Sequence, residues 1–274
     1  MNTLLEMLRY PFLVRALAVG LLVSLCAALL GVSLVLKRYS MIGDGLSHVA
    51  FGAMAVATAL NTAPLMVAIP VVVLAAFLLL RISANSKIRG DAAIAMLSAA
   101  CLAIGVMAVS LTSGMNTDIY NYMFGSILSL SAADAIVSVV LSAAVLLLFL
   151  LFYNRIFSVT FDETFSRATG TKAGLFNGVI AVLTAVTVVL GMRMMGALLI
   201  SSLVIFPALT AMRLCKRFFT VVVCAAVVSV VCFTVGITLS YGLGVPSGAS
   251  VVLTNVAAFL GFSLVRLVRG GVKG

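Results

Sequence analysis

The sequence predicts an all-α, polytopic membrane protein with about nine transmembrane helices, and eight at the fewest. Two observations lead to this fold class: 64% of the 274 residues are hydrophobic and only 9% are charged, whereas soluble domains carry roughly 25% charged residues. The mean hydropathy of +1.32 agrees. A soluble fold of this length leaves about a third of its unfolded surface in water. We therefore exclude a soluble domain and expect lipid around helices whose backbone groups bond internally.

Nine apolar segments approach or exceed the roughly 20 residues that a membrane-spanning helix needs. In chain order, the expected spans are 12–36, 42–60, 64–81, 92–113, 133–154, 174–192, 194–213, 218–240 and 248–266. The second is a weak candidate because it contains Asp44 and His48, and the seventh is weak because only a tight turn around Arg193 separates it from the sixth. We expect residues 1–274 to form a single transmembrane domain without a nucleotide-binding loop.

The basic residues predict the orientation of these spans. They cluster after the first, third, fifth, seventh and ninth segments: Lys37, Arg38; Arg81, Lys87, Arg89; Arg155, Arg167, Lys172; Arg213, Lys216, Arg217; Arg266, Arg269, Lys273. Loops rich in Lys and Arg stay in the cytoplasm, which predicts an external N-terminus, a cytoplasmic C-terminus and a multi-pass location in the cytoplasmic membrane. The net charge of +10 is thereby explained by topology, and we expect no nucleic-acid partner.

The chain start and the cysteines suggest no further processing or cross-linking. Residues 1–14 contain Glu6, Arg9 and Pro11 and no cleavage site follows, so we expect no removable signal peptide. An interfacial amphipathic helix over residues 3–10 would hold Arg9 at the head groups. The five cysteines lie in or beside apolar runs without a CxxC pair, which indicates small buried side chains: Cys26, Cys101, Cys215, Cys224 and Cys232.

The second segment begins with the polar motif Gly43-Asp44-Gly45-Leu46-Ser47-His48. Asp44 and His48, the only histidine, are four residues apart and so share one helix face. A carboxylate at membrane depth is costly and usually marks an ion path, and its oxygen together with an imidazole nitrogen suits Zn(II), Mn(II) or Fe(II). A proton relay and a simple ion pair stay open as alternatives. A metal site needs further ligands, from water, backbone, a binding protein or a second copy.

The longest charged connection contains the sequence 161–170, Phe-Asp-Glu-Thr-Phe-Ser-Arg-Ala-Thr-Gly. Asp162 and Glu163 would occupy a first helical turn and Thr169-Gly170 would end the helix. This predicts a short cytoplasmic helix, which is either a solvated connector or a docking site for a cytoplasmic ATPase. In the docking interpretation the contact residues are Phe161, Asp162, Glu163, Phe165, Arg167 and Gly170.

Two prolines interrupt the C-terminal half. Pro207 lies inside the seventh segment, where it would free a carbonyl and bend the helix, and Pro246 precedes the ninth. Both are candidate gate or pathway residues, although packing alone would also explain Pro207. Met192, Met194 and Met195 are interpreted as packing residues, because the chain has thirteen methionines and several of them lie in other apolar segments.

The string Lys37-Arg-Tyr-Ser-Met-Ile-Gly-Asp-Gly-Leu-Ser-His48 resembles the signature of permease subunits of zinc, manganese and iron ABC importers. Three further stretches resemble the same family, so that the similarity spans residues 37–260: Tyr122-Met-Phe-Gly-Ser-Ile-Leu; Met195-Gly-Ala-Leu-Leu-Ile with Phe206-Pro-Ala; and Leu239-Ser-Tyr with Pro246-Ser-Gly-Ala. The chain departs from many relatives at Phe51, where Leu or Val is common.

This resemblance implies a translocation subunit rather than an enzyme, with ATP hydrolysis in a separate protein. The implied partners are a second copy of the chain, two copies of a cytoplasmic ATP-binding subunit on the 161–170 helix, and an extracytoplasmic metal-binding protein. Asp44 and His48 match the membrane Asp and His of the family and would hold the transported zinc or manganese, or iron, with no permanently bound cofactor. The implied mechanism is alternating access.

Other classes explain the sequence less well. An ion-gradient-driven metal carrier is the main alternative, but such carriers commonly show inverted repeats, which are not evident here, and need no docking helix. An intramembrane aspartyl protease needs a second membrane Asp, whereas Asp118 and Asp134 fall in a predicted outer loop. A serine protease would need a His base on a strained elbow beside its Ser, which the Ser47-His48 pair does not offer.

Overall fold

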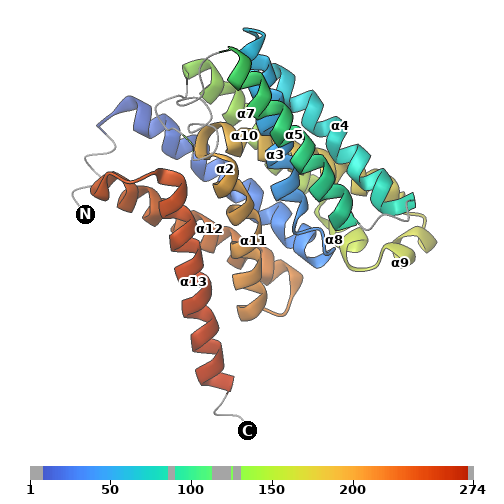
Figure 1. The fold of residues 1–274 in the computed structure, drawn as a ribbon. Coiled ribbons are helices and arrows are strands. Elements are labelled where there is room, and N and C mark those ends of the chain that lie inside the picture. Colours follow the sequence, from blue (N-terminus) through green and yellow to red (C-terminus); the bar gives the residue numbers. More distant parts are fainter. Residues whose placement is uncertain (1–8, 86–89, 113–124, 126–130, 271–274) are drawn as a thin grey trace.

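The computed structural model describes residues 9–85, 90–112, 125 and 131–270, and all regular elements in these ranges are α-helices (Figure 1). Two expectations fall wholly or mainly outside the described residues. These are the interfacial helix at residues 3–10 and the aromatic stretch around residue 122.

Every predicted segment corresponds to one of the longer described helices, and two further short helices lie between the fifth and the sixth of these. In chain order they are α2 (Pro11–Leu36), α3 (Ile42–Ala59), α4 (Pro64–Asn85), α5 (Gly90–Thr112), α7 (Ala132–Leu151), α8 (Tyr153–Phe161), α9 (Glu163–Ala168), α10 (Ala173–Met195), α11 (Ala197–Leu214), α12 (Phe218–Leu243) and α13 (Ser247–Gly270). Among them, α2, α4, α5, α7, α10, α12 and α13 are long and apolar enough to cross a membrane. This confirms an all-helical, polytopic protein. The 18-residue helices α3 and α11 correspond to the two weakest predicted spans.

Local sequence explains where several helices start and stop. Pro11 occupies the first turn of α2, where its missing N–H costs no bond. The Ser131 hydroxyl accepts a hydrogen bond from the Asp134 backbone N–H and so caps α7. Gly196, at φ +83°, turns the chain between α10 and α11, and Gly244, at φ +66°, ends α12. These turns return the chain across the bundle.

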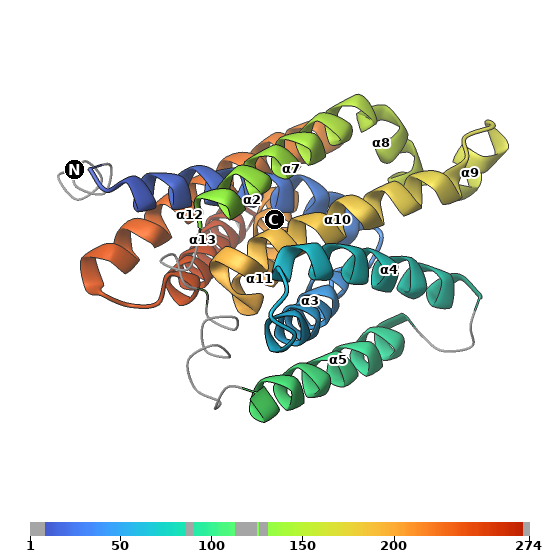
Figure 2. The same ribbon diagram turned by 90° about the horizontal axis from the view of Figure 1, so that it is seen from above.

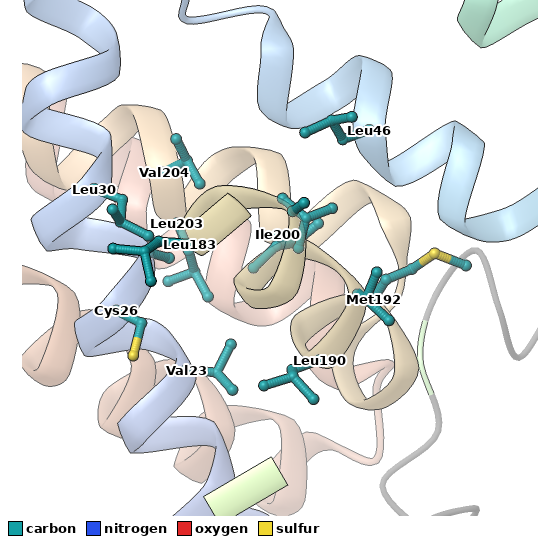
Figure 3. Close-up of a cluster of buried hydrophobic side chains, with 14 of the residues drawn as sticks. Val23, Cys26, Leu30, Leu46, Leu183, Leu190, Met192, Ile200, Leu203 and Val204 are labelled. Atoms are coloured by element: carbon teal, nitrogen blue, oxygen red, sulfur yellow. The ribbon is translucent and has the colours of Figure 1, made fainter. Parts of the chain in front are cut away.

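The core lies where α2, α3, α10 and α11 meet (Figure 3). Buried side chains from all four helices fill it: Val23, Cys26, Leu30, Leu46, Leu183, Leu190, Met192, Ile200, Leu203 and Val204. Met192 is completely buried in this cluster, and Met194 and Met195 are nearly so, in agreement with a packing role. Figure 1 shows α3 and α11 side by side, with α5 packed on α3 and α13 packed on α11.

Close helix contacts depend on glycine at two places. A Cβ added at Gly31 in α2 would lie 2.0 Å from the backbone oxygen of Val204 in α11, and one at Gly52 in α3 would lie 2.5 Å from the backbone oxygen of Cys101 in α5. A side-chain carbon does not approach a non-bonded oxygen so closely. Glycine therefore lets α2 and α11, and α3 and α5, pack backbone to backbone, as small residues often do in membrane bundles.

The connection between α7 and α10 differs from its prediction. The expected fifth span at 133–154 ends at Leu151, and α8 follows directly as a separate helix. The expected helix at 161–170 is shorter than predicted, because Phe161 closes α8 and α9 runs only from Glu163 to Ala168. Asp162 breaks the helix with an extended backbone so that its side chain can cap α9. Figure 2 shows α8 and α9 at the end of the bundle opposite the start of α2.

Candidate functional site

Asp44 and His48 lie on one face of α3, as their spacing predicts. Asp44 is in the first turn, and its Oδ2 lies 3.8 Å from His48 Nε2. The Asp44 side chain is 40% exposed and that of His48 is 25% exposed, although neighbouring Gly43, Gly45, Leu46 and Ser47 are buried. The two polar groups therefore open to one surface of an otherwise closely packed helix.

The start of α3 lies within the bundle rather than at its end. Gly31 contacts Val204, and Gly43 also faces Val204, at 3.7 Å from an added Cβ to Cγ2. Gly31 precedes the end of α2 at Leu36 by five residues, a rise of about 7–8 Å. Because Gly31 and Gly43 meet the same residue, Asp44 is at a comparable depth. A polar pair at this depth in a membrane bundle is expensive and indicates a function.

A second helix contributes a polar group to this site. The Ser201 hydroxyl of α11 donates a hydrogen bond of 3.1 Å to Asp44 Oδ1. The backbone oxygen of Asp44 accepts a hydrogen bond of 2.7 Å from the Ser47 hydroxyl. The carboxylate thus has one oxygen directed at α11 and the other at His48, and its position depends on the packing of α3 against α11.

Asp44 and His48 supply only two ligands, so a metal ion at this site would need additional ligands from elsewhere. Two ligands about 2.1 Å from a tetrahedral ion are about 3.4 Å apart, so the 3.8 Å gap between Asp44 Oδ2 and His48 Nε2 would need to close slightly. Among the described residues there is no group of three or more His, Cys, Asp or Glu side chains close enough to share a metal. The open surface of Asp44 and His48 is where further ligands would have to enter.

The short helix α9 is built by local polar contacts. Asp162 Oδ1 accepts a hydrogen bond of 2.8 Å from the Phe165 backbone N–H at its first turn, and Glu163 Oε1 accepts one of 2.6 Å from Arg167 one turn later. Gly170 follows at φ +82° with no atom within 4 Å of an added Cβ. Glu163 is in the first turn and the glycine follows the end of the helix, as predicted, whereas Asp162 is the residue that caps the helix rather than a member of its first turn.

Glu163 also joins α9 to the membrane helices. Its Oε2 lies 3.7 Å from Nζ of Lys37, directly after α2, and accepts a 3.0 Å hydrogen bond from Nδ2 of Asn177 in α10. The Lys37 ammonium donates to Oδ1 of Asn177. The Lys37 side chain is only 9% exposed. These three side chains form what we call the Lys37–Glu163–Asn177 cluster.

The charges in this cluster depend on one another. Burial lowers the pKa of Lys37 below its usual 10.5, and the nearby Glu163 carboxylate partly opposes this effect. Burial alone would raise the pKa of Glu163. Hydrogen bonds from Asn177 and Arg167, with the positive charges of Lys37 and Arg167, outweigh burial and hold that pKa below 4.5. Glu163 is therefore an anion at neutral pH and compensates the buried ammonium.

Aromatic rings surround α8 and the start of α9. The Phe157 ring lies 5.0 Å from that of Phe161 and 4.9 Å from that of Phe218, the first residue of α12. Phe161 is nevertheless 60% exposed, and Phe165 is 62% exposed. Large exposed rings beside charged residues outside the candidate spans are typical of a protein contact surface.

The two candidate gate residues lie in different environments. Pro207 is buried inside α11, in the same helix as Ser201. Pro246 is exposed and directly precedes α13. The turn before it is held by Ser240, whose hydroxyl donates a 2.6 Å hydrogen bond to the Val245 backbone oxygen. Nothing in this geometry places either proline beside Asp44.

Two side chains of these sites gave no signal in the sequence. Ser201 is one of two adjacent serines in an apolar helix, and Asn177 is a single amide near the start of another. Ser201 is 157 residues from Asp44 along the chain, and Asn177 is 140 residues from Lys37. In the sequence, Lys37 indicates the topology and begins the family-like string 37–48, and neither feature predicts its contact with Glu163.

Known proteins are similar to this chain over most of its length. The "Manganese transport system membrane protein MntC" of Halalkalibacterium halodurans is 28% identical over 254 residues, which cover 93% of this chain and 87% of the relative. The "High-affinity zinc uptake system membrane protein ZnuB" of Haemophilus influenzae is 29% identical, over 92% of this chain and 96% of that protein.

A solved structure shares the whole fold. The chain matches "PsaBC from Streptococcus pneumoniae in complex with Fab" with a TM-score of 0.86 and 27% identity, over 95% of this chain and 94% of the other. The sequence model of the ABC 3 transport family matches residues 9–266, which include every helix described above except the end of α13. Because the match extends over nearly all of the sequence, this chain is a member of the ABC 3 transport family.

Proposed function

We propose that this chain is the permease subunit of an ATP-driven importer that carries a divalent metal ion, zinc or manganese or alternatively iron, across the cytoplasmic membrane. The observation that carries the proposal is the Asp44–His48 pair, inside the bundle of a chain whose relatives are named as manganese and zinc transport proteins. Its oxygen and nitrogen are ligands that these ions accept. The chain is the pathway, and a separate subunit hydrolyses ATP.

The incomplete ligand set supports a pathway between two copies of the chain. Asp44 and His48 are open to one surface, and a second copy related by a two-fold axis would bring the same two side chains to face them. Four ligands would then surround the ion, the number that zinc usually takes. The metal is cargo rather than a resident cofactor, so a site assembled from two halves also gives a means of release when the halves move apart.

The 161–170 segment is proposed as the docking site for two copies of an ATP-binding subunit, one on each permease. Exposed Phe161 and Phe165 supply apolar contact area, and Asp162, Glu163, Arg167 and Gly170 shape the helix between them. Movement of α9 would reach α2 and α10 through the Lys37–Glu163–Asn177 cluster. Nucleotide-driven closure would in this way change access to Asp44 and His48, with Pro207 and Pro246 as candidate bending points.

The topology that fits this proposal has residues 1–274 in one permease domain with eight or nine spans. In it α3 and α11 cross together with the seven longer helices, the N-terminus is outside, and α9 and the C-terminus are in the cytoplasm. The basic residues at the ends of α2 and α11 lie on the α9 side of such a membrane. An extracytoplasmic metal-binding protein would deliver the ion to the opposite side.

The test is ion uptake by sealed vesicles that hold the chain with its ATPase and binding protein. Uptake of Zn(II), Mn(II) and Fe(II) is measured with and without ATP, and with and without a proton gradient. We expect ATP-dependent uptake that favours one ion. Uptake that ignores ATP and follows the proton gradient would instead support an ion-gradient-driven metal carrier.

Substitution at the pair tests the site itself. Asp44→Ala and His48→Ala should each abolish uptake while the subunits still assemble, because each removes one of the two ligands that a copy provides. Assembly is checked by co-purification of the ATPase. Normal uptake by the double variant would contradict a metal site at this pair.

A further inference from the structure

Ser201, in α11, forms a direct hydrogen bond to the candidate metal ligand Asp44 in α3. Its hydroxyl donates to Asp44 Oδ1 at 3.1 Å, whereas its contact with the Ala197 backbone oxygen, in its own helix, is long at 3.5 Å. The neighbouring Ser202 behaves as serines in apolar helices usually do. It is buried and donates to the Leu199 backbone oxygen of its own helix at 2.8 Å.

The hydrogen bond has a chemical consequence for the carboxylate. With Oδ1 occupied by Ser201, Oδ2 is the oxygen that faces His48 Nε2. An ion between the Asp44 and His48 side chains would then meet one carboxylate oxygen rather than two. One-oxygen binding suits small ions with few ligands, such as Zn(II), whereas Ca(II) takes six to eight oxygens and often uses both oxygens of a carboxylate.

We propose that Ser201 is a positioning and specificity-determining residue, which holds Asp44 in a one-oxygen presentation and thereby disfavours Ca(II) against transition-metal ions. This inference rests on the proposed function of Asp44 and His48. It adds that selectivity is set partly by α11, because the hydroxyl crosses from α11 to α3 at the point where Val204 packs between Gly31 and Gly43.

The experiment compares Ser201→Ala with Ser202→Ala in vesicles that contain the complete importer. The two variants lose the same atom from adjacent positions of one helix, but only the first removes a bond to Asp44. Uptake of the preferred transition-metal ion is measured over a range of ion concentrations, and then in the presence of increasing Ca(II). Ser201→Thr, which keeps a hydroxyl, serves as the rescue variant.

For Ser201→Ala we expect the apparent KM for the transition-metal ion to rise about threefold to tenfold, as for the loss of one ordinary hydrogen bond, because the Asp44 side chain is partly exposed. Ca(II) should inhibit at a concentration lower by a similar factor, with little change in maximal rate. Ser202→Ala and Ser201→Thr should resemble the unaltered protein. A change in maximal rate alone would indicate a structural role and overturn the inference.

The same experiment separates failure of the inference from failure of the proposed function. If Asp44→Ala abolishes uptake but Ser201→Ala has the KM and the Ca(II) inhibition of Ser202→Ala, Ser201 has no positioning role and the metal site stands. If Asp44→Ala transports normally, the metal site itself is wrong, and the inference is overturned with it.

Discussion

The Lys37 ammonium, directly after α2, lies 3.7 Å from the Glu163 carboxylate in α9. The Lys37 side chain is 9% exposed and that of Glu163 is 37% exposed, so the cation is the buried partner. Asn177 of α10 bonds to both side chains. One carboxylate thus joins a short helix outside the candidate spans to two of the long helices.

Removing the charge of Glu163 should destabilise the protein more than removing the charge of Arg167, the second cation that Glu163 contacts. Glu163→Gln leaves the Lys37 ammonium buried without a counter-ion, and we expect a loss of about 1–2 kcal/mol, reduced from the value for a fully buried pair because Glu163 is partly exposed. Arg167→Gln is the matched control. Its side chain is 67% exposed, so the loss should be below about 0.5 kcal/mol. Thermal unfolding of the purified protein measures both, and equal losses would contradict the role of Lys37.

The same pair predicts a pH dependence. The folded-state pKa of Glu163 lies below 4.5, so its contribution to stability is complete above pH 4.5 and is lost as the pH falls through the folded-state pKa. The difference in melting temperature between the unaltered protein and Glu163→Gln should therefore shrink from pH 5 downward. A difference that stays constant to pH 3 would contradict the ion pair.

Titration of Lys37 should change the stability of the protein at alkaline rather than acidic pH. Its folded-state pKa is lowered from 10.5, so the charged form weakens the fold and stability should rise as the pH passes upward through the folded-state value. Without the opposing charge of Glu163, that pKa falls further. Glu163→Gln should therefore regain part of its lost melting temperature as the pH rises from neutrality toward 10.5, measured against the double variant Lys37→Met, Glu163→Gln, which should not.

The cap of α9 offers a test of coupling that leaves the membrane helices intact. Asp162→Ala removes the acceptor for the Phe165 N–H, a loss of about 1 kcal/mol for the short helix. We expect ATP hydrolysis by the assembled importer to continue while metal uptake per ATP falls severalfold. Asp162→Asn keeps a capping oxygen and should retain most of the coupling. Equal uptake per ATP in Asp162→Ala and the unaltered protein would show that α9 does not transmit movement.

The contact between α2 and α11 should tolerate no side chain at Gly31. Gly31→Ala would place a carbon 2.0 Å from the Val204 backbone oxygen, and the helices would have to separate at a cost of about 1–3 kcal/mol. Gly261→Ala, in the interior of α13, meets no atom within 4 Å and should be neutral or stabilising by about 0.5–1 kcal/mol. Melting temperatures of the two variants should move in opposite directions, and a stable Gly31→Ala protein would contradict the close packing.

Features that depend on neighbours in sequence could be predicted from the sequence. Each of the nine apolar segments corresponds to one main helix, because the length of an apolar run and the need for internal backbone bonds decide this locally. The fifth segment was predicted too long, since α7 ends at Leu151 and α8 begins at Tyr153. Asp44 and His48 share a face because four residues make about one helical turn. The predicted start of α9, at residue 161, was two residues too early. Asp162 has an extended backbone that ends α8 at Phe161 and caps α9, and the acidic pattern alone did not predict this break.

Features that join distant segments were decided by tertiary structure alone. Ser201 and Asp44 are 157 residues apart, and Lys37 and Asn177 are 140 residues apart. These pairs meet because glycine backbones let α2, α3 and α11 pack closely and because α10 returns beside the end of α2. Hydropathy specifies that each of these helices is buried but not which faces meet. The sequence by itself therefore determined the helices and the two metal-ligand candidates, and packing determined which side chains hold those candidates in place.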